Sequence, residues 1–404
     1  MSHTEDRTFA EFFAGIGLMR MGLERAGWRI AFANDIDEDK FRMYRDHFTN
    51  AAEFVLGDVH HLEASKVPTV ALATASFPCN DLSLAGARKG LAGAQSSAFW
   101  GFVGILEKLG GRRPPLVLLE NVTGFLTSHD GADFRDALLA LNRLGYAVDA
   151  FIIDAAHFVP QSRRRLFVVG SRTPTASTLE TSPAPLLSEA RPRSLAEFIV
   201  GNPKIRWNIR RLPPLPERSL RVDDILETLS PSSGMWWKRE RCDYLLGQMS
   251  PRHRAEADAM IQGKATSYGT VFRRVRNGKS MAELRTDGVA GCLRTPRGGS
   301  GRQIVVAAGR GNFAVRLLTP RECARLMGAD DFTIQVSLNQ ALFGFGDAVC
   351  VPVLEWIAQR YLNLAWSEIH PLALASPRRS APARRTQASE RAPSRRAARP
   401  ASRY

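Results

Sequence analysis

The sequence predicts an α/β protein in which helices cover both faces of a parallel sheet, followed by a smaller, irregular and basic domain. Three observations predict this class. Over the first 170 residues, short and nearly continuous apolar runs alternate with helical patterns, as in strands buried on both faces. Polar residues follow the ends of several of these runs. Beyond about residue 173 the alternation stops and positive charge accumulates.

The elements of the first part follow one another at regular intervals. Helical patterns run from Leu18 to Ala26, ending at Gly27, and from Phe134 to Leu144. The apolar runs expected to form strands are 8–13, 28–34, 54–56, 70–77, 116–119, 146–154 and 166–170. Ligands of such sheets bind beyond the carboxyl ends of the strands. The polar residues at those ends are Asp35, Asp58, Cys79 and Glu120.

The second half of the chain has a different composition and no regular alternation of strands and helices. Pro-rich stretches after residue 173 indicate a linker. A helix is expected after Thr319 as N-cap, with Pro320 at its first position and Glu322 in its first turn, and another over 348–362. The tail has almost no large apolar residues and should be disordered. The predicted boundaries are 1–175 for the first domain, completed by 335–366; 185–318 for the basic domain; 319–366 for returning helices; and 376–404 for the tail.

The net charge of +15 is unevenly distributed. Residues 191–318 carry 24 Lys and Arg against 11 Asp and Glu, and residues 376–404 carry nine Arg and one Glu, which leaves the rest at a net −6. A protein that binds polyphosphate segregates charge in this way, because neutralised phosphates release counterions. A solvated arginine-rich surface would have the same totals, so charge alone leaves both interpretations open.

Other totals argue against several classes of protein. No apolar run reaches the roughly 18–20 residues of a membrane span, and the N-terminus lacks the pattern of a secretory signal. The five cysteines are odd in number and far apart, which predicts neither a disulfide framework nor a metal site. We therefore expect a cytoplasmic protein with free thiols.

Three sets of residues could carry chemistry. Cys79 follows an apolar strand and Pro78, which places its thiol in a loop at the ligand edge, although a lone cysteine is often a small core residue. Glu120 also lies at this edge, as a proton donor or as an ordinary acid at a helix N-terminus. Alternation sends Arg163 and Arg165 to one side, where they could support an anion or a base carbonyl, or lie in a solvated loop.

A glycine loop follows the first strand. It reads Phe13-Ala14-Gly15-Ile16-Gly17 and differs from the GxGxxG of dinucleotide enzymes. Any tight turn from strand to helix needs glycine, so the loop alone is a weak signal. Asp35 stands about 20 residues further on, where nucleoside-binding proteins place an acid on a ribose hydroxyl. Together they indicate a nucleoside cofactor without naming it.

Taken in order, these motifs resemble those of the DNA cytosine-C5 methyltransferase family. The resemblance covers residues 9–170 and about 315–362, and its most specific parts are Pro-Cys, Glu-Asn-Val and Gln-x-Arg-x-Arg in that order. The segments that carry it are FFAGIGLMRMGLERAGW, ANDID, GDV at 57–59, SFPCNDLSLAG, LLENVTGF, QSRRRLFVVG, LTPRECARLMG and QALFGFGDAVCVPV. It implies a Rossmann-like, S-adenosylmethionine-dependent methyltransferase sheet and a protein associated with the nucleoid.

The resemblance also implies roles for individual residues. Cys79 would add to C6 of a cytosine flipped out of the duplex. Glu120 would hold the N3 edge and assist protonation, and Arg163 and Arg165 would steady the nucleophile region and the base. The residues implied to bind S-adenosylmethionine are Phe13, Gly15, Gly17, Leu18, Asp35, Ile36, Asp58, Val59, Pro78, Asp347 and Ala348. Asp35 would take the ribose hydroxyls and Asp58 the adenine amino group.

Two motifs depart from the family pattern. Many members have Gln where this chain has Asn80, and many have Asn-Ser where it has Asp347 and Ala348. The second change puts a negative charge near the amino-acid end of the cofactor. Neither change touches the nucleophile or the acid, which indicates variation within the family.

The basic segment would recognise double-stranded DNA. Its glycines allow close approach to phosphates and its arginines supply charge; the expected contacts are Arg294, Arg297, Gly298, Gly299 and Arg302. Trp236 and Trp237 could stack on DNA or belong to a core. We expect a monomer, with a restriction endonuclease acting separately as a candidate partner.

There are three alternatives, of which the first lies within the chemistry of the family and the other two come from other classes of function. They are methylation of cytosine in RNA, a DNA-binding regulator without catalysis, and a nicotinamide-dependent oxidoreductase. The large basic segment favours duplex DNA, intact Cys79 and Glu120 argue against a silent regulator, and the missing GxGxxG argues against the oxidoreductase.

Overall fold

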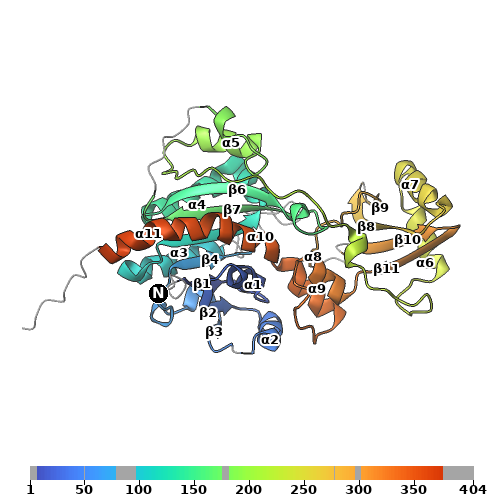
Figure 1. The fold of residues 1–404 in the computed structure, drawn as a ribbon, viewed down its shortest axis with the longest axis horizontal. Coiled ribbons are helices and arrows are strands. Elements are labelled where there is room, and N and C mark those ends of the chain that lie inside the picture. The colour runs from blue at the N-terminus through green and yellow to red at the C-terminus, as the bar shows by residue number, and fades with distance from the viewer. Residues whose placement is uncertain are drawn as a thin grey trace, which may run out of the picture.

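The computed structural model describes residues 7–49, 51–78, 97–174, 182–276, 278–295 and 302–375. A seven-stranded sheet forms the larger part of the molecule, with the order β3-β2-β1-β4-β5-β7-β6 (Figure 1). Its strands are β1 (Thr8–Phe12), β2 (Arg29–Asp35), β3 (Phe54–Leu56), β4 (Leu72–Ala75), β5 (Leu116–Val122), β6 (Ala147–Asp154) and β7 (Arg164–Ser171). All seven strands were expected from the sequence, with ends that differ by up to three residues.

The prediction of a wholly parallel sheet is wrong at one strand. β7 runs antiparallel to both of its neighbours, β5 and β6, whereas the pairs among β1 to β5 are parallel. The connection from β6 to β7, residues 155–163, is too short for the crossover of a dozen or more residues that a parallel pair needs. As a consequence, the beginning of β7 lies at the edge where the parallel strands end.

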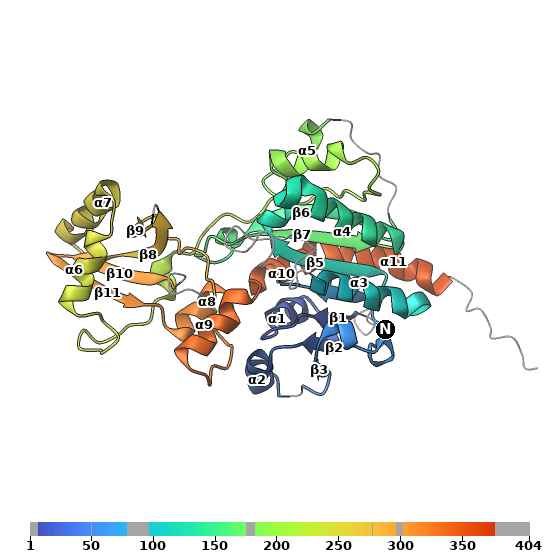
Figure 2. The ribbon, with the colours of Figure 1, turned by 180° about the vertical axis from the view of Figure 1, so that it is seen from behind.

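Helices cover both faces of this sheet (Figures 1 and 2). One apolar core joins the sheet to α1 (Leu18–Arg25), α2 (Glu38–His47), α10 (Val351–Ile357) and α11 (Asn363–Ala375). The core on the opposite face joins it to α3 (Ser97–Leu109), α4 (Ala132–Arg143) and α5 (Arg193–Gly201). Two buried layers of this kind explain why most residues of these strands are apolar on both faces of the sheet.

A second, smaller unit has a sheet and a core of its own. Its antiparallel strands have the order β11-β10-β8-β9, and their bounds are β8 (Ser267–Arg276), β9 (Lys279–Arg285), β10 (Ile304–Gly309) and β11 (Asn312–Leu317). Helices α6 (Arg239–Gly247) and α7 (Pro251–Gln262) pack on this sheet, and the buried residues of the separate core lie between 242 and 315. Figure 1 shows this unit beside the larger one, with α8 (Pro320–Leu326) and α9 (Leu338–Asp347) between them.

The start of the second unit differs from the predicted boundary at residue 185. The side chains of Leu195 and Ile199 in α5, and of Trp207, belong to the core of the larger sheet. The backbone of Asn208 donates to the carbonyl of Val148, which extends the edge of that sheet beyond β6. Residues 186–208 therefore pack with the first domain, although the Pro-rich stretches on either side of them indicated a linker.

The returning helices begin as the sequence predicts. Thr319 caps α8. Its hydroxyl accepts from the backbone N–H of Glu322, and the Glu322 carboxylate accepts from the backbone N–H of Thr319. Among the described residues, one helical stretch, Leu338–His370, is long and apolar enough to cross a membrane. Since 67% of its most apolar window is buried within the protein, its apolar side chains pack in the core. The predicted disordered tail, 376–404, lies outside the described residues.

Candidate active site

The glycine loop between β1 and α1 makes a tight turn at the carboxyl edge of the sheet. Phe13, Gly15 and Gly17 have positive φ angles of 59°, 56° and 82°. A Cβ atom on Gly17 would lie 2.4 Å from Phe48 Cε2, so this position needs glycine for its conformation and for space. The left-handed conformation of Phe13 is strained, and such strain clusters at ligand-binding loops.

The loops after β2 and β3 lie beside this turn. Asp35 Oδ2 accepts from the Gly15 backbone at 2.8 Å and its Oδ1 accepts from the Asp37 backbone at 2.9 Å. Burial raises the pKa of Asp35. Asp58 accepts from the backbone of His60, which holds the pKa of Asp58 below its usual range. The backbone of Gly57 donates to the carbonyl of Asp35 at 2.8 Å, so the acids predicted for ribose and adenine lie at one edge.

This edge combines an exposed apolar side chain with buried polar atoms. The side chain of Ile36 is 68% exposed and offers an apolar surface beside the Asp35 carboxylate, while Leu18 and Val59 are buried beneath. Within the described part of the chain, Thr74 Oγ1 and Ser76 Oγ on and after β4 are buried polar atoms without a hydrogen-bond partner. Native proteins rarely leave such atoms unpaired, so they mark a place where a ligand or water completes the structure.

Glu120 and Arg165 form an ion pair at the same edge. Arg165 Nε lies 3.0 Å from Glu120 Oε1, and Glu120 is only 6% exposed. The antiparallel direction of β7 makes this contact, because it pairs the beginning of β7 with the end of β5. The next residue, Asn121, donates from its amide to the carbonyl of Phe77, two residues before Cys79. Through Asn121, Glu120 is thus linked to the segment that leads into Cys79, the predicted nucleophile.

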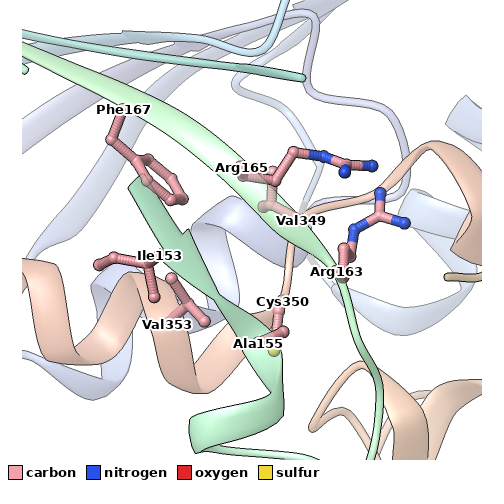
Figure 3. A pocket seen from close by; sticks show the side chains of 8 residues that line it. All are labelled: Ile153, Ala155, Arg163, Arg165, Phe167, Val349, Cys350 and Val353. Atoms are coloured by element: carbon pink, nitrogen blue, oxygen red, sulfur yellow. The ribbon is translucent and has the colours of Figure 1, made fainter. Parts of the chain in front are cut away.

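Arg163 is buried and holds three segments together. Its guanidinium donates to the carbonyls of Leu293, Gly346 and Ala348, from segments more than a hundred residues away. Burial lowers the pKa of Arg163. In Figure 3, the side chains of Arg163 and Arg165 extend to the same side, as alternation predicted. The described contacts of Arg163 are those of a positioning residue.

Replacing Arg163 with Met should destabilise the fold, because Met leaves buried carbonyl oxygens without donors. We expect the free energy of unfolding to fall by about 2–5 kcal/mol. Urea unfolding followed by fluorescence measures this change. Arg164, which is exposed at the start of β7, provides the matched control. A loss no larger for Arg163→Met than for Arg164→Met would refute the positioning role.

Cys292 joins the arginine cluster, although the sequence analysis gave it no role. Its sulfur accepts from Arg163 Nη1 at 3.3 Å. Burial alone would raise the pKa of the thiol, but Arg163, Arg165 and Arg294 outweigh it and lower this pKa. No local signal in the sequence could have revealed this, since the contact spans about 130 residues.

The other predicted site residues have varied positions. Pro78 is exposed and ends the described segment; Cys79, Arg297, Gly298 and Gly299 lie outside the described residues. Arg294 is exposed, and Arg302 donates to the side chain of Asn339 at 2.6 Å. Asp347 forms an ion pair with Lys40, which the sequence analysis also missed. No group of three or more His, Cys, Asp or Glu side chains in the described segments could hold a metal ion.

The chain is similar to known cytosine methyltransferases over most of its length. It is 30% identical to the type II methyltransferase M.DsaV of Dactylococcopsis salina over 88% of this chain and 86% of the relative. It is 26% identical to the type II methyltransferase M.MspI of Moraxella sp, covering 91% and 73%. A DNA-cytosine methyltransferase of Escherichia coli is 29% identical, covering 87% and 76%.

Solved structures share the fold. A methyltransferase of Entamoeba histolytica, EhMeth, aligns with a TM-score of 0.58 at 14% identity, over 90% of this chain and 98% of that one. The Dnmt2 methyltransferase of S. pombe aligns with a TM-score of 0.57 at 17% identity, over the same shares. The model of the family described as C-5 cytosine-specific DNA methylase matches residues 7–363. With its fold, its motifs and these relatives in agreement, the chain belongs to the C-5 cytosine-specific DNA methylase family.

Proposed function

We propose that this DNA cytosine methyltransferase moves a methyl group from S-adenosylmethionine to C5 of one specific cytosine in double-stranded DNA, through a covalent bond between Cys79 and C6. The observation that carries the proposal is the meeting of two half-sites at one sheet edge. The glycine loop with Asp35 forms the first, and the Glu120–Arg165 pair beside Phe77 forms the second. The strands that lead into them, β1 and β5, both pair with β4, so the two half-sites lie at nearby strand ends, as direct methyl transfer requires.

The residues at this edge divide the chemistry between them. The Cys79 thiolate adds to C6, which makes C5 nucleophilic, and covalent catalysis thereby replaces one difficult step with easier ones. Glu120 holds the N3 edge of the base and assists protonation there, while Arg165 fixes the orientation of Glu120. S-adenosylmethionine, when bound, supplies an electrophilic methyl group. Loss of the C5 proton to a base then releases the thiolate and restores the ring.

The residues that fit the cofactor surround the glycine loop. Asp35 would accept from the ribose hydroxyls, and Asp58 from the adenine amino group. The exposed side chain of Ile36 would cover the adenine ring. The other residues assigned to the cofactor are Phe13, Gly15, Gly17, Leu18, Val59, Pro78, Asp347 and Ala348.

The smaller unit would bind the DNA. Its exposed arginines can neutralise phosphates, and the base to be methylated must leave the duplex to reach the sheet edge. Gly346 packs against the backbone of Arg294 and Thr295, where an added Cβ would lie 2.7 Å away. The segment that begins the predicted DNA loop is thus packed on the catalytic domain. We expect one chain to act alone, with any cognate endonuclease acting separately.

Bisulfite sequencing of plasmid DNA from cells that express the chain tests this function. We expect protected cytosines in one short sequence context, with the Cys79→Ala variant as the control that gives none. Absence of protection, with the protein folded and the cofactor bound, would overturn DNA as the substrate. Bisulfite sequencing of RNA from the same cells then tests the alternative acceptor.

A further inference from the structure

Lys40 and Asp347 carry charges that oppose the dipoles of their own helices. Lys40 lies in the first turn of α2, where the partial positive charge of the helix disfavours a cation. Asp347 is the last residue of α9, where the partial negative charge disfavours an anion. Neither charged residue stabilises its own helix, so each must take part in another interaction.

The two side chains meet beside the glycine loop. Lys40 Nζ lies 2.8 Å from Asp347 Oδ2, and their side chains are 19% and 46% exposed. A Cβ on Gly15 would lie 3.9 Å from Lys40 Cδ, which places the lysine stem against the loop. Burial alone would lower the pKa of Lys40, but Asp347 and Asp35 outweigh it and raise this pKa. The lysine therefore stays charged at the edge of the cofactor site.

The position of the pair is fixed by the packing around it. A Cβ on Gly344 in α9 would lie 2.9 Å from the sulfur of Met43 in α2 and 3.0 Å from Ile16 in the glycine loop. The absence of a side chain at Gly344 lets the two helices and the loop approach closely. Because Asp35 and Asp58 account for the nucleoside end, the pair lies where the amino-acid end of the cofactor remains to be recognised.

We propose that Lys40 recognises the amino-acid end of S-adenosylmethionine by donating to its carboxylate, while Asp347, which the family resemblance already places near this end, accepts from its ammonium. This inference rests on the proposed function. The mutual ion pair uses one of the three N–H donors of the lysine and leaves acceptor sites on the carboxylate, so both groups can bind ligand without separating. A purely structural pair would only fasten α9 to α2.

Calorimetric titration of the full chain with three ligands separates these two roles. The ligands are S-adenosylmethionine, its decarboxylated form, and 5′-methylthioadenosine, which lacks the amino-acid end. For Lys40→Met we expect affinity for S-adenosylmethionine to fall by about 10- to 100-fold, as for loss of a charge-assisted hydrogen bond. Affinity for the other two ligands should change by less than about threefold. Lys40→Arg should restore most of the affinity for S-adenosylmethionine.

The control is Arg42→Met, which removes a cation from the same helix, where Arg42 pairs with Asp39 on the exposed face. It should leave all three affinities unchanged. An equal loss of affinity for methylthioadenosine in Lys40→Met would overturn the inference and leave a structural role for the pair. Failure of the unaltered chain to bind any of the three ligands would overturn the proposed cofactor together with the inference.

Discussion

Replacing Cys79 with Ser should abolish methylation while leaving DNA affinity largely intact. A serine hydroxyl has a far higher pKa than a thiol, so almost no nucleophilic anion is available to attack C6. We expect the rate of methyl transfer to fall by at least about 10³-fold. Incorporation of labelled methyl groups into DNA measures the rate, and fluorescence anisotropy with a labelled duplex measures the affinity.

Cys292→Ser is the matched control for this experiment. Cys292 lies against Arg163 and Arg165 in the described part of the chain, and positive charge lowers the pKa of its thiol, which makes it the rival nucleophile. A serine there can still accept a hydrogen bond from Arg163, so the fold and most of the activity should remain. Activity that survives in Cys79→Ser and disappears in Cys292→Ser would reverse the assignment.

Replacing Glu120 with Gln should lower the turnover rate by about 10²- to 10⁴-fold, the usual contribution of a general acid or base. Gln keeps the size of the side chain but loses the charge that pairs with Arg165 and the ability to deliver a proton. We expect kcat to fall much more than the DNA affinity changes. Single-turnover methylation with saturating DNA isolates the chemical step.

Two comparisons keep this prediction specific. Glu63→Gln, at an exposed acid that pairs with Lys66, should have no effect on the rate. Urea unfolding of Glu120→Gln shows whether loss of the ion pair between Glu120 and Arg165 destabilises the fold enough to explain the lower turnover. A folded Glu120→Gln variant with the turnover of the unaltered chain would remove Glu120 from the mechanism.

Features encoded in short stretches of sequence were predicted well. The seven strands follow from apolar runs, since a strand buried on both faces requires them. The turn after β1 follows from Gly15 and Gly17, because their backbone angles are costly for other residues. The start of α8 follows from Thr319 and Glu322, whose reciprocal cap is a contact across three residues. The position of Glu120 at the ligand edge follows from the end of its apolar run.

Tertiary structure alone decided which of these elements meet. The pairing of β7 with β5 gives Glu120 its partner Arg165. The short connection after β6 indicates an antiparallel β7, but it does not indicate which strand lies on the other side of β7. The contacts of Arg163, the packing of α5 on the first sheet, and the pair of Lys40 with Asp347 join residues tens to hundreds of positions apart. The sequence by itself therefore determined the strands of the larger sheet, the start of α8 and the family, and it predicts the residue types of the chemistry. Packing decided the partners, because such contacts depend on how whole layers close on one another and not on the spacing of neighbouring residues.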